Sequence, residues 1–297
     1  MKDTPILGTH RVPQPSSFSF AAPLRIAAVS YLNAVPLIWG LKKGPSREQF
    51  QLEFMVPALC ADALRAGTVQ ASIIPSIEYQ RIPGLRIVPG LSISSSGPVR
   101  SVMLIARRPI PEVRSVALDT SSRTSYCLAQ ILLKRHFRIN PRYVPHAPDI
   151  AAMLVECDAA LMIGDPALAS DFPGLEVYDL AELWKAMTGL PFVFAFWAVR
   201  REVATEEVVK AFWKSAEYAF QNLDAIVREE SARTGLSPEL VRTYLTESID
   251  FTLGEQNLAG LRLFYSLAQE LGFIREARPL DIIGEPAIPR PFLRRVE

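Results

Sequence analysis

Short apolar runs separated by amphipathic segments mark the first third of the chain. The segments between the runs carry helix signals: Pro36 opens 36–41 at a first helical position, and Gly67 follows 58–66 as a stop. The runs are too short for helices and almost wholly apolar, which is typical of buried parallel strands. They lie at 25–30, 51–56 and 70–75. This order of strands and helices predicts an open parallel sheet.

The pattern then repeats in the middle of the chain. An apolar strand is predicted at 101–106, after which Pro109 and Pro111 interrupt the pattern. Further strands are predicted at 115–119, 142–145, 159–163, 177–180 and 191–200, with helices at 124–137 and 150–156. The sequence therefore predicts a second α/β unit.

Beyond residue 200 the spacing of apolar residues is helical. It predicts a long amphipathic helix over 205–228 and a last helix over 252–271 that Gly272 ends. Between them, Ser237 is a good N-cap residue for a helix that Pro238 opens.

We therefore expect an α/β fold of two lobes. A leader would cover 1–23, and lobe 1 would combine 24–105 with a helical part at 200–297. Lobe 2, at 106–199, would be inserted between them, with two chain crossings near Ala106 and Val199 acting as a hinge. In open α/β sheets ligands bind beyond the carboxyl ends of the strands, so a cleft between the lobes is the expected site.

Composition narrows the function classes. Hydrophobic residues make up 49% of the chain, and 32 Lys and Arg balance 31 Asp and Glu, so we expect no nucleic-acid partner and no membrane partner. The sequence shows no export signal and no apolar run of about 18 residues. We expect a cytoplasmic protein whose Pro- and Ser-rich leader is flexible; the oligomeric state is not predicted.

Cysteine and histidine usage argues against a metal or disulfide framework. The three cysteines, Cys60, Cys127 and Cys157, form no CxxC motif, and the three histidines lack paired spacing. We expect reduced thiols, no metal and no cofactor.

Polar residues that follow the predicted strands are rich in hydroxyls and poor in bases. Such a set suits the binding of a small anion better than nucleophilic attack. At the strand ends it comprises Ser30, Tyr31, Asn33, Ser76, Glu78, Asp119, Thr120, Ser121, Ser122, Arg123, Thr124, Ser125, Gly164 and Asp165. Ser94, Ser95, Ser96 and Ser101 join it from the expected approach to the hinge.

The stretch 119–125 stands at a strand-to-helix junction. Free N–H groups and hydroxyls there would hold a carboxylate, although Ser and Thr are also ordinary helix caps. Asn33 could bind across the cleft or be a locally satisfied turn residue. Asp165 could be a base, a hydroxyl acceptor or the cap of a helix opened by Pro166. The aromatic residues near 184–197 are expected in the core.

Five ordered motifs resemble the chorismate dehydratases of the futalosine route to menaquinone. They are VSYLNAVPL at 29–37, IPSIEY at 74–79, LDTSSRTS at 118–125, IGDPAL at 163–168 and WKAMTGLPFVF at 184–194. The resemblance covers about 25 to 270 and implies a fold similar to type II periplasmic binding proteins. One departure, Gln70, lies at the start of a strand, away from its carboxyl end.

The resemblance implies conversion of chorismate to 3-(1-carboxyvinyloxy)benzoate and water, without metal or redox cofactor. Asn33 is the expected catalytic residue. The expected substrate-binding residues are Ser30, Ser76, Ser101, Ser121, Ser122, Thr124, Gly164 and Asp165. The proton acceptor stays open between the substrate's own enolpyruvyl carboxylate, which we favour, and Asp165, Glu78 or Asp119. The alternatives are a cytoplasmic small-anion binding protein and the sister 1,4-dihydroxy-6-naphthoate synthase.

Overall fold

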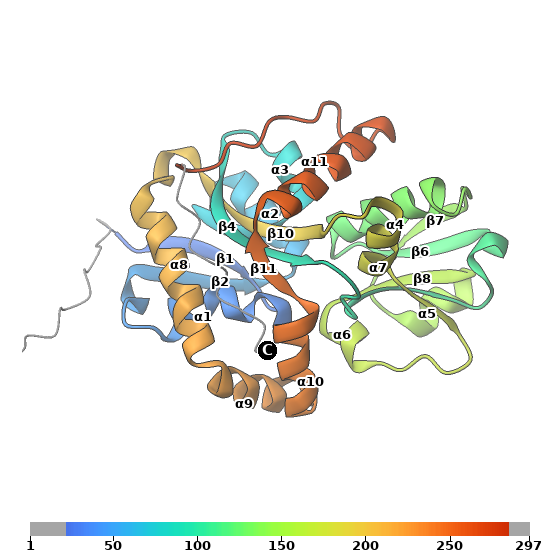
Figure 1. Ribbon diagram of the computed structural model, residues 1–297, viewed down its shortest axis with the longest axis horizontal. Coiled ribbons are helices and arrows are strands. Elements are labelled where there is room, and N and C mark those ends of the chain that lie inside the picture. The colour runs from blue at the N-terminus through green and yellow to red at the C-terminus, as the bar shows by residue number, and fades with distance from the viewer. Residues whose placement is uncertain (1–21, 285–297) are drawn as a thin grey trace, which may run out of the picture.

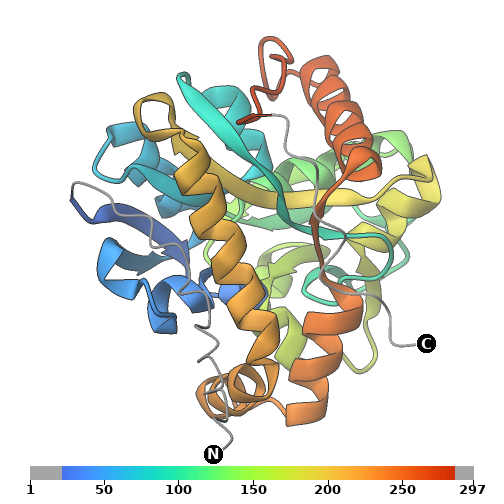
Figure 2. The same ribbon diagram turned by 60° about the vertical axis from the view of Figure 1, so that its left-hand side comes forward.

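The computed structural model describes residues 22–284 and contains two β-sheets, each covered by helices (Figures 1 and 2). Lobe 1 is built on a six-stranded sheet of order β11-β4-β10-β3-β1-β2, and lobe 2 on a five-stranded sheet of order β7-β6-β8-β5-β9. The expected two-lobed α/β architecture is confirmed. Most of the leader expected at 1–23, and the end of the chain beyond 284, lie outside the described residues.

The sheet of lobe 1 begins as the apolar runs predict. Its strands are β1 (Leu24–Val29), β2 (Phe50–Met55), β3 (Ala71–Pro75), β4 (Leu85–Ser95), β10 (Phe192–Arg200) and β11 (Asp250–Leu253). The first three are parallel, whereas β10 runs antiparallel to β3 and β4, and β11 antiparallel to β4. All five residues of β3 are buried, which explains why it is apolar at every position except Ser72.

Helices cover both faces of this sheet. They are η1 (Leu32–Ala34), α1 (Val35–Lys43), η2 (Arg47–Gln49), α2 (Pro57–Ala66), α3 (Ser76–Arg81), η4 (Arg201–Val203), α8 (Glu206–Gln221), α9 (Leu223–Thr234), α10 (Pro238–Thr243), the π-helix η5 (Tyr244–Ser248) and α11 (Glu255–Glu270). Gly40 allows α1 to pack closely on α8, because a Cβ there would lie 2.4 Å from the Cα of Ser215.

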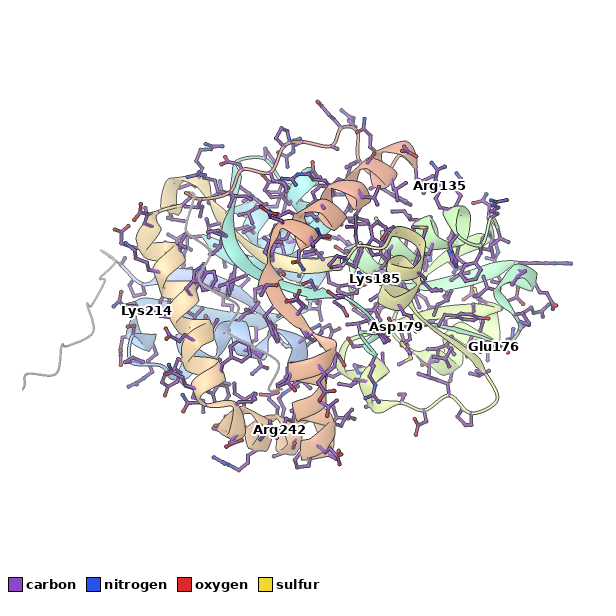
Figure 3. The ribbon with its side chains drawn as sticks, viewed as in Figure 1. Arg135, Glu176, Asp179, Lys185, Lys214 and Arg242 are labelled. Atoms are coloured by element: carbon purple, nitrogen blue, oxygen red, sulfur yellow. The ribbon has the colours of Figure 1, made fainter. Side chains whose placement is uncertain are left out.

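Lobe 2 repeats the plan on a smaller scale. Its strands are β5 (Val102–Ala106), β6 (Ser115–Asp119), β7 (Arg142–His146), β8 (Ala159–Ile163) and β9 (Glu176–Asp179). Its helices are η3 (Ile110–Glu112), α4 (Arg123–Arg135), α5 (Ile150–Glu156), α6 (Gly164–Ala169) and α7 (Leu180–Thr188). Charged side chains such as Arg135, Lys214 and Arg242 lie on the outside of the two lobes (Figure 3).

Strand pairing places the two chain crossings elsewhere than expected near Ala106 and Val199. Strand β5 pairs with β8 and β9, so it belongs to lobe 2, whereas β10 pairs with β3 and β4 in lobe 1. The chain therefore leaves lobe 1 after Ser95 and returns just before Phe192. These two residues are partners in the β4–β10 ladder, so the crossings lie side by side.

Two helix predictions are wrong in their bounds. The helix expected over 205–228 breaks at Asn222, whose side-chain amide donates to the carbonyl of Tyr218 over 2.8 Å and competes with the helical pattern. The helix expected to begin at Thr252 begins at Glu255, because 250–253 pairs with β4 as strand β11. Strand β4 itself was not predicted.

Candidate active site

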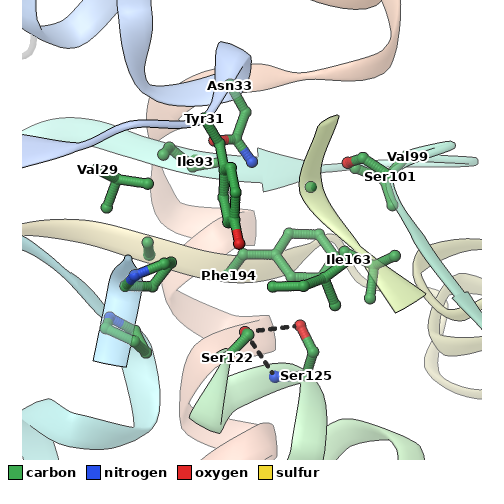
Figure 4. A pocket seen from close by; sticks show the side chains of 15 residues that line it. Val29, Tyr31, Asn33, Ile93, Val99, Ser101, Ser122, Ser125, Ile163 and Phe194 are labelled. Atoms are coloured by element: carbon green, nitrogen blue, oxygen red, sulfur yellow. Dashed lines mark hydrogen bonds between the residues drawn. The ribbon is translucent and has the colours of Figure 1, made fainter. Parts of the chain in front are cut away.

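A pocket lies between the two lobes, and part of it is open to solvent (Figure 4). The space inside it that the centre of a water-sized molecule can occupy is about 40 Å³, so the pocket is narrow. Both lobes and the crossing segment contribute to its wall. The lining residues are Val29, Tyr31, Asn33, Pro57, Pro75, Ile93, Val99, Ser101, Val102, Ser122, Ser125, Ile163, Gly164, Phe194 and Ala195.

The polar side chains of the wall are all neutral. They belong to Tyr31, Asn33, Ser101, Ser122 and Ser125, and no Asp, Glu, His, Lys or Arg is among the described residues that line the pocket. Hydroxyls and an amide can donate hydrogen bonds to an anion without carrying charge. The wall therefore suits the binding of carboxylates and offers no strong base of its own.

The N-terminus of α4 supplies the anion-binding end of the pocket. Ser122 is the N-cap residue, and its Oγ accepts from the Ser125 N–H over 3.4 Å. The same hydroxyl donates to the Ser125 Oγ over 3.0 Å (Figure 4). The Ser122 proton is thus used within the helix, while the Ser125 hydroxyl keeps its own proton for a ligand. Of the two alternatives that the sequence presents, capping is what Ser122 does in the structure, and the Ser125 hydroxyl remains on the pocket wall.

Asn33 stands in η1, directly beyond β1, and reaches the pocket half-buried. Its Oδ1 is buried and has no hydrogen-bond partner among the described residues. A buried, unpaired amide oxygen is costly unless a ligand or water satisfies it. This orphaned oxygen is the expected feature of a residue that binds substrate.

Ser101 is held from behind by a residue that the sequence did not single out. The Tyr244 hydroxyl, fully buried in the π-helix η5, donates to the Ser101 Oγ over 2.7 Å, so the Ser101 proton stays available to a ligand. Burial raises the pKa of Tyr244 far above its ordinary value, which keeps it a donor. π-helical turns often occur at functional sites, and this one places a tyrosine behind the pocket wall.

Two of the expected binding residues, Ser76 and Thr124, hold neighbouring elements together instead of lining the pocket. The Thr124 Oγ1 accepts from the Ile77 N–H over 3.2 Å, and the Ser76 hydroxyl donates to the carbonyl of Val193 over 2.8 Å. Both side chains are almost fully buried. They fix α3 of lobe 1 against α4 of lobe 2 and against β10.

Asp165 also spans the lobes. Its Oδ1 accepts from the Leu32 N–H over 2.8 Å, and its Oδ2 pairs with Arg233 over 2.8 Å. Both carboxylate oxygens therefore bind groups of lobe 1, and Asp165 itself does not line the pocket. In the structure this side chain holds the two lobes together. Its neighbour Gly164 does line the pocket, against the ring of Tyr31.

Glu78, another candidate base, is engaged in a second ion cluster between the lobes. Its buried carboxylate pairs with Arg65, Arg81 and Arg123. Arg123 also pairs with Asp62 over 2.8 Å, and this hydrogen bond lowers the pKa of Asp62. Three cations hold the Glu78 carboxylate, and Glu78 does not line the pocket.

Comparison with known proteins places the chain in a family. Residues 24–270 match the family model described as "Menaquinone biosynthesis". The chain belongs to this menaquinone biosynthesis family.

Relatives and solved structures agree with that assignment. Over 261 residues the chain is 32% identical to the chorismate dehydratase of Thermus thermophilus, covering 82% of this chain and 93% of that protein. The chorismate dehydratase of Campylobacter jejuni is 28% identical over 250 residues, covering 82% and 96%. Among solved structures, the periplasmic aliphatic sulphonate binding protein SsuA of Escherichia coli superimposes with a TM-score of 0.61 at 15% identity, covering 86% and 95%. The expected periplasmic-binding-protein-like fold is confirmed.

The remaining expected residues lie beside the pocket. Ser30 is exposed and does not line it, and the Ser121 hydroxyl is buried behind it. Conversely, Tyr31 and Ser125 line the pocket; the sequence placed both in the wider hydroxyl-rich set but not among the expected substrate-binding residues. Phe194, expected in the core, is nearly buried yet forms part of the wall. The strand-end rule found the segments that meet at the pocket, and the direction of each side chain decided which residue lines it.

The described part of the chain, residues 22–284, holds neither a metal site nor a membrane-spanning helix. Within that range no three His, Cys, Asp or Glu side chains gather in a group that could hold a metal ion. No helix there is both long and apolar enough to span a membrane.

Ser125→Ala is expected to raise KM about tenfold. The variant loses one hydrogen bond to a ligand carboxylate, worth about 1.5 kcal/mol, while the backbone N–H groups of α4 remain. Steady-state kinetics measure this change. Ser170→Ala is the control, because the Ser170 hydroxyl donates to the Pro166 carbonyl within lobe 2 and Ser170 does not line the pocket. An unchanged KM in the Ser125 variant would limit the helix end to a structural role.

Proposed function

We propose that this protein is a chorismate dehydratase, a hydro-lyase that acts in the cytoplasm in menaquinone biosynthesis by the futalosine route. It converts chorismate to 3-(1-carboxyvinyloxy)benzoate and water. The observation that carries the proposal is the interlobe pocket, whose polar wall consists of neutral donors beside the N-terminus of α4. Chorismate is a dianion with two carboxylates, and neutral donors at a helix N-terminus can hold such a ligand.

The ring carboxylate is placed at the N-terminus of α4, against Ser125 and the free backbone N–H groups. The C3 hydrogen of chorismate is vinylogous to this carboxylate, so charge released at C3 spreads toward it. Donors at that end of the pocket therefore stabilise the charge as it develops, in the manner of an oxyanion hole.

The enolpyruvyl carboxylate of the substrate is the proposed proton acceptor. Asp165 and Glu78 are engaged in ion pairs, and Asp119 lies outside the pocket wall. A folded substrate brings its own carboxylate over C3, and Asn33 orients that group. Loss of the C4 hydroxyl then completes an aromatic ring, which supplies the driving force.

Turnover tests this function directly. Purified protein and chorismate, with no metal or nucleotide added, are expected to yield the aromatic enol ether and water, followed by mass spectrometry. A chelator is expected to leave the rate unchanged. Chorismate recovered intact, with saturable binding in calorimetry, would instead indicate a carboxylate-binding protein, and turnover of a cyclised futalosine derivative would indicate the sister synthase.

A further inference from the structure

Departure of the C4 hydroxyl is the step that the proposed function leaves without a proton donor. Hydroxide is a poor leaving group, and a positioned general acid typically accelerates such a step by about 10²–10⁴. The donor must be a side chain that reaches the pocket and stays protonated at neutral pH.

Tyr31 meets both requirements. It lines the pocket from lobe 1, and Figure 4 shows its side chain extending into the pocket, with the hydroxyl at the far end. Among the polar groups of the wall, a phenol with an ordinary pKa near 10 is a much stronger acid than a serine hydroxyl or an asparagine amide. It is therefore the group best able to give up a proton.

The packing of Tyr31 holds its hydroxyl in place. A Cβ added at Gly164 would lie 3.0 Å from two ring atoms, so the ring rests directly on the backbone of lobe 2. Burial raises the pKa of Tyr31, and a hydrogen bond with the Ser121 side chain lowers it. The charges of Asp119 and Asp165 raise the pKa of Tyr31 further. The phenol thus remains protonated through the neutral range.

Two polar side chains, Asp119 and Ser121, lie beside Tyr31. The Asp119 Oδ1 accepts from the Ser121 N–H over 2.8 Å, whereas the Asp119 Oδ2 is buried without a hydrogen-bond partner among the described residues. Burial raises the pKa of Asp119. Buried unpaired groups are costly and call for an explanation, which is often a functional role.

We propose that Tyr31 is the general acid that protonates the departing C4 hydroxyl, with Ser121 and Asp119 as positioning residues behind it. This inference rests on the proposed dehydration of chorismate. The C3–H bond breaks and its proton passes to the enolpyruvyl carboxylate, while its electron pair forms the new ring double bond. The C4–O bond breaks, and the oxygen leaves with its pair and the Tyr31 proton as water. The Tyr31 phenolate then takes up the proton held by the product carboxylate, so the protein ends unchanged.

The test compares Tyr31→Phe with the wild-type protein on two substrates. On chorismate, kcat is expected to fall about 10²-fold while KM stays within about threefold, because the ring contact is kept and only the proton is lost. On an analogue with fluorine in place of the C4 hydroxyl, fluoride leaves without a proton, so the two proteins are expected to react at similar rates.

Tyr143→Phe is the matched control. The Tyr143 hydroxyl is also buried without a partner among the described residues, and burial raises the pKa of Tyr143 to about 12, but it lies away from the pocket. Its loss is expected to leave kcat unchanged. Ser121→Ala and Asp119→Asn are expected to lower kcat about tenfold in the wild type and to add nothing in the Tyr31→Phe background.

The outcomes separate the two proposals. Near-normal kcat of Tyr31→Phe on chorismate, or equal losses on both substrates, would overturn the role of Tyr31 and leave the proposed function standing. A wild-type protein that releases no product from chorismate would overturn the proposed function and, with it, this inference.

Discussion

Asn33→Ala is expected to lower kcat by about 10²-fold and to change KM less, because the amide orients the enolpyruvyl carboxylate that takes the C3 proton and a misplaced reacting group can have an effect of that size. Its Oδ1 is buried without a partner among the described residues, so the folded protein does not use this oxygen for its own stability. The fold is therefore expected to survive the change, which circular dichroism can verify. Steady-state kinetics on chorismate give kcat and KM.

Asn33→Asp separates charge from shape at the same position. The carboxylate keeps the size of the amide but places a negative group beside a dianion, so KM is expected to rise as well as kcat to fall. Asn140→Ala serves as the control, since Asn140 is exposed in lobe 2 and lies outside the pocket wall. A folded Asn33→Ala protein with near-normal kcat would remove Asn33 from the mechanism.

The parallel strands of both sheets were predictable because their pattern is local. Strand β3, for example, is buried along its whole length, and every residue in it except Ser72 is apolar. Strand β4 was not predictable in this way, since Pro89, Gly90 and several serines interrupt it. It is a strand because β10 and β11 pair with it on its two sides, and both follow much later in the chain. Such pairing is invisible to a window of neighbouring residues.

For the candidate site, too, features set by neighbouring residues were predictable, and features set by distant residues were not. Strand ends and the helix junction predicted where Asn33, Ser101 and Ser122 would gather. Side-chain direction was not predictable, because it depends on contacts between the lobes. Asp165 illustrates this: its carboxylate points to the Leu32 N–H and to Arg233 in lobe 1, partners 133 and 68 positions away in the sequence.

Gly164→Ala is expected to lower kcat/KM by about 10²-fold, although it adds one methyl group, because a displacement of a positioned group by a fraction of an ångström to 1 Å can have such an effect. Gly164 has a φ of +70°, and a Cβ there would lie 3.0–3.1 Å from three atoms of the Tyr31 ring. The ring must move, and with it the hydroxyl that faces the substrate.

Gly174→Ala isolates this displacement from backbone strain. Gly174 also has a positive φ, +76°, and lies in lobe 2, but nothing lies within 4 Å of its added Cβ. Both variants are expected to lose about 1–2 kcal/mol of stability from the left-handed backbone, measurable as similar shifts in denaturant midpoint. Only Gly164→Ala is expected to lose activity. Equal kcat/KM values for the two variants would show that the site tolerates movement of Tyr31. A loss of kcat/KM in Gly164→Ala alone is expected if the two lobes must be in contact at the Tyr31 ring before chorismate reacts.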